Sequence, residues 1–143
     1  MKRLNEEREY KFSDGVYHGD IKILRQGNGV MNYFNGDIFE GNWEANKRVY
    51  GTLFFANGKK YIGEFANDKI NGSGKMVWGD GSYEGNFKNG KFEGFGVLTI
   101  NGGDNGNTIY EGNFKDNKKH GEFIVVENGN RIKRKYSKDI EKI

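Results

Sequence analysis

An aromatic-x-Gly motif recurs along this chain at almost constant spacing, and this repeat constrains the fold more than any other feature of the sequence. The motif glycine is followed two residues later by a large apolar residue, which is Ile21, Trp43, Phe65, Phe87 or Phe114. The motifs lie 22, 22, 22 and 27 residues apart, and they begin at Tyr17, Phe39, Tyr61, Tyr83 and Tyr110. Self-similarity at such a period is typical of stacked units that bury their apolar faces only against their neighbours.

The spacing within each unit predicts a β-hairpin. Side chains alternate between the two faces of a strand, so the two apolar residues and the glycine share one face, while residues such as Glu84 and Asn86 lie on the other. A short apolar run follows each motif, and most runs end in Asn-Gly or Asp-Gly, which favour tight hairpin turns. The internal glycines leave room for the rings of adjacent units. We therefore expect an all-β fold, a single-layer elongated antiparallel sheet of stacked β-hairpins with about eleven or twelve strands.

The phrases YEGNFKNGKFEGFG, which starts at Tyr83, and YEGNFKDNKKHGEF, which starts at Tyr110, resemble the MORN repeat. The chain departs from the pattern at Ile21, Val49 and Phe123, which stand where a ring or a glycine is expected. The resemblance implies an aromatic-lined groove and roles in scaffolding, in cytoskeletal or ciliary assemblies, or in contact with acidic phospholipids. The layout is similar to that of small standalone MORN proteins of the retinophilin-like type, which implies a myosin tail as one candidate partner.

The repeat divides the chain into three parts. Residues 1–9 form an N-terminal segment, and residues 10–130 form the β-ribbon of about five MORN repeats plus a partial N-terminal one. Residues 131–143 form a basic amphipathic tail.

In the tail the apolar spacing changes. Ile132, Tyr136, Ile140 and Ile143 recur at steps of four, four and three residues, which is the spacing of one helix face. We therefore expect a short C-terminal helix that caps the open edge of the sheet, because exposed edges need covering. A contact with lipid or with an acidic partner is the alternative, through the basic residues Arg131, Lys133, Arg134, Lys135 and Lys138.

The aromatic ladder is the main candidate site. We expect most of its rings to be core residues, but a one-layer sheet cannot cover all of them. Rings left open would line a groove for a helix or an extended peptide of another protein. The partner-binding groove would then comprise Tyr17, Phe39, Trp43, Tyr61, Phe65, Tyr83, Phe87, Tyr110 and Phe114.

Acidic residues follow the ladder at neighbouring positions. Alternation places them on the face opposite the rings. They form either a solvated face or a stripe that receives Lys or Arg from a partner. The stripe consists of Asp20, Glu40, Glu64, Glu84 and Glu111.

Residues that could support catalysis or hold a metal are sparse. The chain has no cysteine, and its two histidines, His18 and His120, have no partner at motif spacing. The Gly-x-Gly pairs precede expected strands and lack a phosphate-binding context. The insertion GGDNGNT, residues 102–108, misses the spacing of a calcium loop and is expected to be a flexible loop. We therefore expect no enzyme, no catalytic residue, no metal and no cofactor.

Composition and charge limit the remaining classes. Mean hydropathy is −0.89 with 34% hydrophobic residues, and no stretch reaches the length of a transmembrane span. The N-terminal residues MKRLNEEREY lack the apolar core of a signal peptide, so a cytoplasmic protein is expected. The net charge of +3 is concentrated in the tail, and the ribbon lacks a basic excess, so no nucleic-acid partner is expected.

The sequence thus favours a non-enzymatic protein-interaction or scaffold module that binds a helical or extended partner segment, in a cytoskeletal or ciliary assembly. The alternative is a peripheral binder of acidic phospholipids that uses the basic tail. A homodimer through an unpaired sheet edge is a further expectation.

Overall fold

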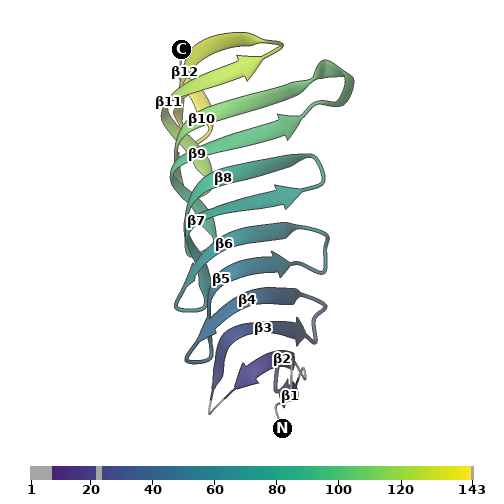
Figure 1. Cartoon of the computed structure of the whole chain (residues 1–143). Coiled ribbons are helices and arrows are strands. Elements are labelled where there is room, and N and C mark those ends of the chain that lie inside the picture. The colour runs from purple at the N-terminus through teal and green to yellow at the C-terminus, as the bar shows by residue number, and fades with distance from the viewer. Residues whose placement is uncertain (1–7, 22–23, 143) are drawn as a thin grey trace.

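The computed structural model describes residues 8–21 and 24–142. Within these ranges, thirteen strands form one antiparallel sheet, and each strand pairs with its neighbours in the sequence (Figure 1). The strands are β1 (Glu9–Phe12), β2 (Gly15–Ile21), β3 (Arg25–Tyr33), β4 (Ile38–Glu44), β5 (Lys47–Phe54), β6 (Lys60–Ala66), β7 (Lys69–Trp78), β8 (Gly81–Lys88), β9 (Lys91–Asn101), β10 (Asn107–Lys115), β11 (Lys118–Glu127), β12 (Asn130–Ser137) and β13 (Ile140–Lys142). The predicted single-layer sheet of stacked hairpins is confirmed.

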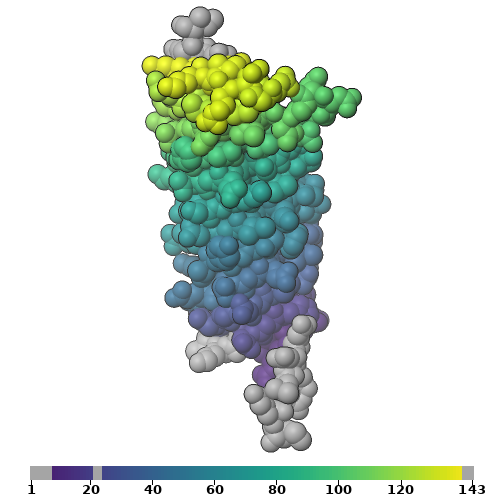
Figure 2. All heavy atoms as spheres, turned by 45° about the horizontal axis from the view of Figure 1, so that its top comes forward, coloured from purple at the N-terminus to yellow at the C-terminus, as the bar shows by residue number. Residues whose placement is uncertain are grey.

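The molecule is an elongated stack of hairpins. The colours in Figure 2 run in chain order from one end to the other, so the hairpins are layered as they are in the sequence. Residues 1–7 of the expected N-terminal segment lie outside the described residues, and Glu9 begins β1. No helix among the described residues has the length and apolar character needed to cross a membrane.

The insertion at residues 102–108 lengthens one hairpin. The turn between β9 and β10 extends past its neighbours (Figure 1) and contains the short 3₁₀ helix η1 (Gly103–Asn105). The Gly102 N–H donates to the Gly106 carbonyl at 2.9 Å, and the Gly103 N–H donates to Asn101 Oδ1 at the same distance. The expectation of a plain loop is therefore wrong in part, because this segment has its own hydrogen bonds and its last residues belong to β10.

A single row of paired glycines crosses nine consecutive strands. We call it the glycine column: Gly19, Gly29, Gly41, Gly51, Gly63, Gly74, Gly85, Gly96 and Gly112. On the face that carries the rings, the inner face, the Tyr61 ring lies over Gly74, and a Cβ atom at Gly74 would collide with it. Tyr83 covers Gly96 in the same way, so the glycines do make room for rings.

The rings of the inner face form one continuous chain. Each contact in this ring stack is edge-to-face, with centroids 5.1–5.4 Å apart, as aromatic pairs prefer. The first ring of one hairpin contacts the second ring of the same hairpin and of the next. The stack runs in the order Tyr17, Trp43, Phe39, Phe65, Tyr61, Phe87, Tyr83, Phe114, Phe123 and Tyr136.

Phe123 changes the stack near its C-terminal end. It pairs with Gly112, at the position where the preceding hairpins place their second glycine. Its ring, which is buried, fills the space that the first ring of the motif occupies in those hairpins. Tyr110 is therefore only half-buried, and its ring lies 6.4 Å from that of Tyr136. The predicted ladder is correct except at this step.

The predicted C-terminal helix is wrong. Residues Asn130–Ser137 form β12, which pairs with β11, and a tight turn at Lys138 and Asp139 leads into β13. The spacing was misleading because residues four apart, such as Ile132 and Tyr136, share a face in a strand as well as in a helix. Pairing also satisfies the edge of β11 with backbone hydrogen bonds, which a covering helix would leave unmade. Ile143 lies outside the described residues.

The tail is a sixth, degenerate copy of the repeat. Tyr136 pairs with Gly121, just as Phe114 pairs with Gly94 one hairpin earlier. This register places Ile132 at the position of the first aromatic residue. The β-ribbon therefore continues past residue 130, through what the sequence indicated was a separate tail.

Clasps between successive hairpin tips hold one edge of the ribbon. The tip turns are Ala45–Asn46, Asn67–Asp68, Asn89–Gly90, Asp116–Asn117 and Lys138–Asp139, all with positive φ at both residues. In four clasps an Asn or Asp side chain at the second turn position accepts the N–H of a residue in the preceding hairpin, for example Phe92 N–H to Asn117 Oδ1 at 2.8 Å. In the remaining clasp the Gly90 N–H donates to the Ile70 carbonyl. The clasps thus fix each hairpin to the next.

Candidate interaction surface

The structure places the predicted groove residues in the core. Eight of them are buried, and Tyr110 is half-buried. The interpretation of these rings as packing residues is confirmed. Their contact with a partner stays a prediction, and the rings left open at the surface are different ones.

Sequence reasoning missed the residues that cover the ring stack. At the position paired with the second ring of each hairpin, a side chain folds back over the stack. The Arg48 guanidinium lies 4.8 Å from the Phe65 ring centre, and Phe92 stacks on Tyr83 with centroids 3.9 Å apart. The five residues at this position are Arg25, Arg48, Ile70, Phe92 and Lys119. The signal available in the sequence was their spacing, five residues after the second ring of the motif in four hairpins and four residues after Ile21 in the first.

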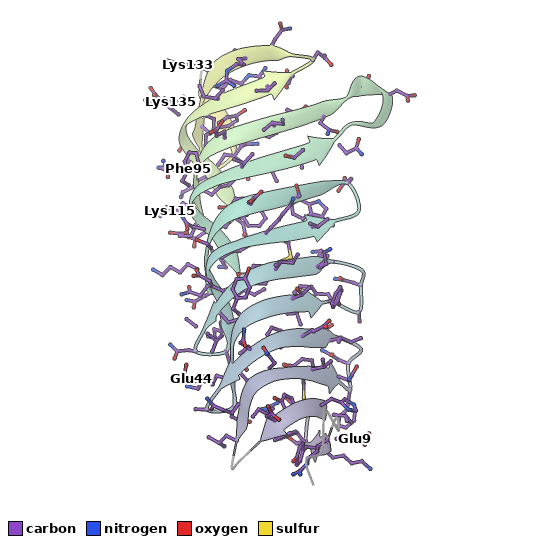
Figure 3. All side chains as sticks on the ribbon, viewed as in Figure 1. Glu9, Glu44, Phe95, Lys115, Lys133 and Lys135 are labelled. Atoms are coloured by element: carbon purple, nitrogen blue, oxygen red, sulfur yellow. The ribbon has the colours of Figure 1, made fainter. Side chains whose placement is uncertain are left out.

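Large apolar side chains are exposed on the outer face, the face opposite the rings. Phe95 is 52% exposed and Tyr50 is 50% exposed, and Ile38, Phe54 and Ile62 are also exposed. Figure 3 shows Phe95 projecting from the outside of the bent ribbon. They alternate with core residues along their strands, so the period-2 pattern could have located them, but nothing in the motif marked them as exposed.

Three hollows lie in a line on the outer face, with glycine-column backbone as their floor; we call them together the outer groove. Their volumes are about 510, 460 and 300 Å³. The walls of the first hollow include His18, Val30 and Glu40. The walls of the second include Tyr50, Ile62, Glu64, Lys75 and Glu84. The walls of the third include Phe95, Glu111, Glu122, Arg131 and Lys133. The hollows lie between two rows of outer-face side chains, because the residues of the glycine column face inward toward the rings.

The predicted acidic stripe lies along the outer groove. Glu40, Glu84 and Glu111 belong to one row of cross-strand neighbours on the outer face, which also contains Lys75. Glu64 lies in the adjacent row, and its Oε2 accepts the Ser73 N–H at 2.6 Å. The placement of these four carboxylates opposite the rings is confirmed, whereas Asp20 lies at an irregularity in the pairing of β2 with β3. Carboxylates therefore predominate in the first two hollows.

The basic residues of the tail do not share one face. Lys133 and Lys135 are exposed on the outer face of β12, together with Arg131 (Figure 3). Arg134 is on the inner face, with Nη1 3.4 Å from Glu127 Oε1, and Lys138 lies in a tip turn. The tail therefore presents three cations, not five, on the outer face, and two of them, Arg131 and Lys133, line the third hollow.

The buried tyrosines are structural hydrogen-bond donors. The Tyr61 hydroxyl donates to the Glu64 carbonyl at 2.7 Å, and the Tyr83 hydroxyl donates to the Asn86 carbonyl at 2.9 Å. Burial raises the pKa of Tyr83 to about 12 and raises the pKa of Tyr61 further. Both phenols are therefore neutral at physiological pH.

The described residues contain no group of three His, Cys, Asp or Glu side chains that could hold a metal ion. His18 lines the first hollow and His120 lies near the last tip turns, at opposite ends of the ribbon. The outermost described strands are β1 and β13, and dimerisation through these edges stays a prediction.

The comparison with protein families agrees with this geometry. The model of the MORN repeat matches five segments, which together make up more than half of the chain: residues 22–38, 39–60, 61–82, 83–105 and 110–122.

Proposed function

The chain belongs to the MORN-repeat family, whose repeats are generally protein- or membrane-interaction modules, and on that premise we propose that it is a non-enzymatic scaffold that holds a partner segment in the outer groove. The observation that carries this proposal is the line of three hollows with exposed Tyr50, Ile62 and Phe95 in their walls. Exposed aromatic and aliphatic side chains beside a concave surface are typical of protein-binding sites.

The shape of the groove favours an extended segment. The hollows reach from β2 to β12, which at about 4.8 Å per strand is on the order of 50 Å. An extended chain rises about 3.3 Å per residue, so roughly 15 residues would cover the groove. A helix, about 10 Å wide, would contact the walls without reaching the glycine floor.

The charge of the groove favours a basic segment. Glu40 lines the first hollow, and Glu64 and Glu84 line the second beside the single cation Lys75. Lys or Arg side chains of a partner would pair with these carboxylates and fix the direction in which the segment lies. We propose a cytoskeletal or ciliary protein as the source of the segment, because the chain resembles small standalone MORN proteins.

Site-specific photo-cross-linking tests this proposal. A photoreactive amino acid replaces Ile62 in the second hollow or, as the matched control, Phe34, which is exposed outside the hollows. The proposal predicts that position 62 cross-links to one basic segment of one protein in cell extract, and that position 34 does not. Equal labelling from both positions, or no cross-link from position 62, would contradict it.

A membrane contact is the second candidate function. It is favoured by Arg131, Lys133 and Lys135, which are exposed on one face of β12. Basic clusters attract anionic lipid surfaces, and this attraction weakens as salt is added. Replacing the three residues by serine should release the protein from phosphatidylserine vesicles, and retention of the variant would exclude this candidate.

A further inference from the structure

A fourth hollow lies between the last two hairpin tips, apart from the outer groove. Its volume is about 230 Å³, and its lining is more basic than that of the other three hollows. We call it the tip hollow, and the residues that line it are Lys115, Asp116, Lys118, His120 and Lys138.

The strand register explains why the cations gather there. Lys115 and Lys118 are direct cross-strand partners at the end of the β10–β11 hairpin. His120 follows Lys118 by two residues in β11, so both side chains leave the same face. Lys138 comes from the next tip turn, which is held against β11 by the Asp139 N–H bond to the Lys119 carbonyl at 2.9 Å. Among the described residues, none of the three lysines has a carboxylate partner within ion-pair distance.

The residue type at one position of this hollow differs from the residue types at the same position of earlier hairpins. At the position of His120, three of the four earlier hairpins carry Gln26, Asn71 and Glu93, each of which accepts a hydrogen bond from the first N–H of the following tip turn, and the fourth carries Val49. The distances are 2.9, 3.3 and 2.9 Å. The last tip has a histidine in place of the acceptor and a lysine in the turn. A position that accepts a hydrogen bond in three earlier hairpins thus carries an imidazole here, beside three lysines.

We propose that the tip hollow binds the phosphate group of a phosphorylated serine or threonine on a partner protein. A phosphate monoester carries nearly two negative charges and three acceptor oxygens, which match three ammonium groups and an imidazole. The cations surround a recess, and the Asp116 carboxylate lies beside them. A planar anionic membrane would meet that carboxylate as well, whereas a single phosphate on a flexible side chain can enter between the lysines. The site is separate from the outer groove, so the two proposals can fail independently.

Backbone amide spectra recorded during titration with inorganic phosphate and with O-phosphoserine test the proposal. The amides of Lys118, His120 and Lys138 should shift and saturate, while that of His18, at the opposite end of the ribbon, should not. Chloride at equal ionic strength is the control. Shifts no larger than those in chloride would overturn the proposal.

Three variants make the test specific. His120→Glu restores the residue type of Glu93 and should weaken phosphate binding about tenfold without loss of the fold. Lys138→Asn keeps a residue that tolerates positive φ and should weaken it about three- to tenfold. Asp116→Asn removes the one carboxylate among the described residues that line the hollow and should strengthen binding. Equal affinities for wild type and His120→Glu would overturn the assignment.

Vesicles separate the phosphoprotein from a lipid. Phosphatidylcholine vesicles with and without phosphatidylserine are sedimented with wild type and with His120→Glu. The proposal predicts no difference between the two proteins. Sedimentation that depends on both phosphatidylserine and His120, without saturable binding of O-phosphoserine, would assign the hollow to lipid and overturn the proposal.

Discussion

Arg48 and Asp68, twenty residues apart, join two successive hairpin tips through three hydrogen bonds. Asp68 Oδ1 accepts the Arg48 N–H at 3.1 Å and its Nε–H at 2.8 Å, and the Asp68 carbonyl accepts from Nη2 at 2.8 Å. The same guanidinium lies over the Phe65 ring, so one side chain ties the tip clasp to the ring stack. Asp68 itself is half exposed.

Asp68→Gly should reduce the free energy of unfolding by about 1–2 kcal/mol, because it removes both hydrogen bonds to Asp68 Oδ1 while keeping a residue that tolerates positive φ. The native ribbon has glycine at this position in Gly90. Asp68→Asn, which mimics Asn46 and Asn117, keeps the acceptor oxygen and should cost less than about 0.5 kcal/mol. Urea unfolding measures both, and equal losses would show that the charge, not the hydrogen bond, holds the clasp.

Gly74→Ala should lower the free energy of unfolding by about 2–3 kcal/mol, because the added methyl group collides with the Tyr61 ring. Gly79→Ala is the matched control, since a Cβ atom there meets open space and should change stability by less than about 0.5 kcal/mol. Urea unfolding of the two variants checks this. Similar losses would mean that backbone freedom, not ring packing, determines where glycine is needed.

The ring stack should make the protein sensitive to alkaline pH. Folding raises the pKa of Tyr83 to about 12 from the ordinary value near 10, so the neutral phenol is favoured in the folded state. This contribution to stability is fully present below about pH 10 and is lost as the pH rises through about 12. Tyr83→Phe removes the titrating group and should flatten the fall in stability over that range. Tyrosinate absorbance and circular dichroism, recorded together, measure the transition, and an equally steep fall in the variant would contradict this assignment.

The tail should behave as a strand in solution. Cα chemical shifts for Ile132–Tyr136 are expected to have the sign of β-structure, because β12 pairs with β11 along this segment. Tyr136→Ala should cost about 3 kcal/mol, since it removes the ring that covers Phe123 at the end of the stack. Helical shifts, or a Tyr136→Ala variant as stable as wild type, would contradict the sixth repeat.

Much of the fold follows from the sequence because the repeat specifies local geometry. Period-2 spacing determines which residues share a face, and the glycines of the motif pair with one another across the strands, as Gly85 does with Gly74 and Gly96. The strand structure of the tail, in residues 131–142, could not be predicted from the motif. Ile132 and Arg134 replace the tyrosine and the glycine of the motif, and a four-residue spacing fits a strand face as well as a helix face.

The candidate surface was less predictable. Which rings are buried depends on residues that fold back from the hairpin tips, and Arg48 and Phe92 belong to no motif. The outer groove lies between two rows of outer-face side chains on either side of the glycine column, so it depends on the pairing of the strands. The tip hollow likewise became visible only when His120 was placed beside Lys138 of the next hairpin.

The central claim is that the outer face, and not the ring stack, contacts the partner. The most direct test measures the affinity of the cross-linked partner segment for Ile62→Ser and for the double variant Trp43→Ala, Phe87→Ala, at a temperature where both proteins are folded. The account predicts that Ile62→Ser weakens binding about tenfold with little change in melting temperature. It predicts that the double variant Trp43→Ala, Phe87→Ala has a lower melting temperature but binds the segment with unchanged affinity. The account is contradicted if the folded double variant loses affinity while Ile62→Ser binds as wild type does. That result would show that the partner contacts the aromatic ladder.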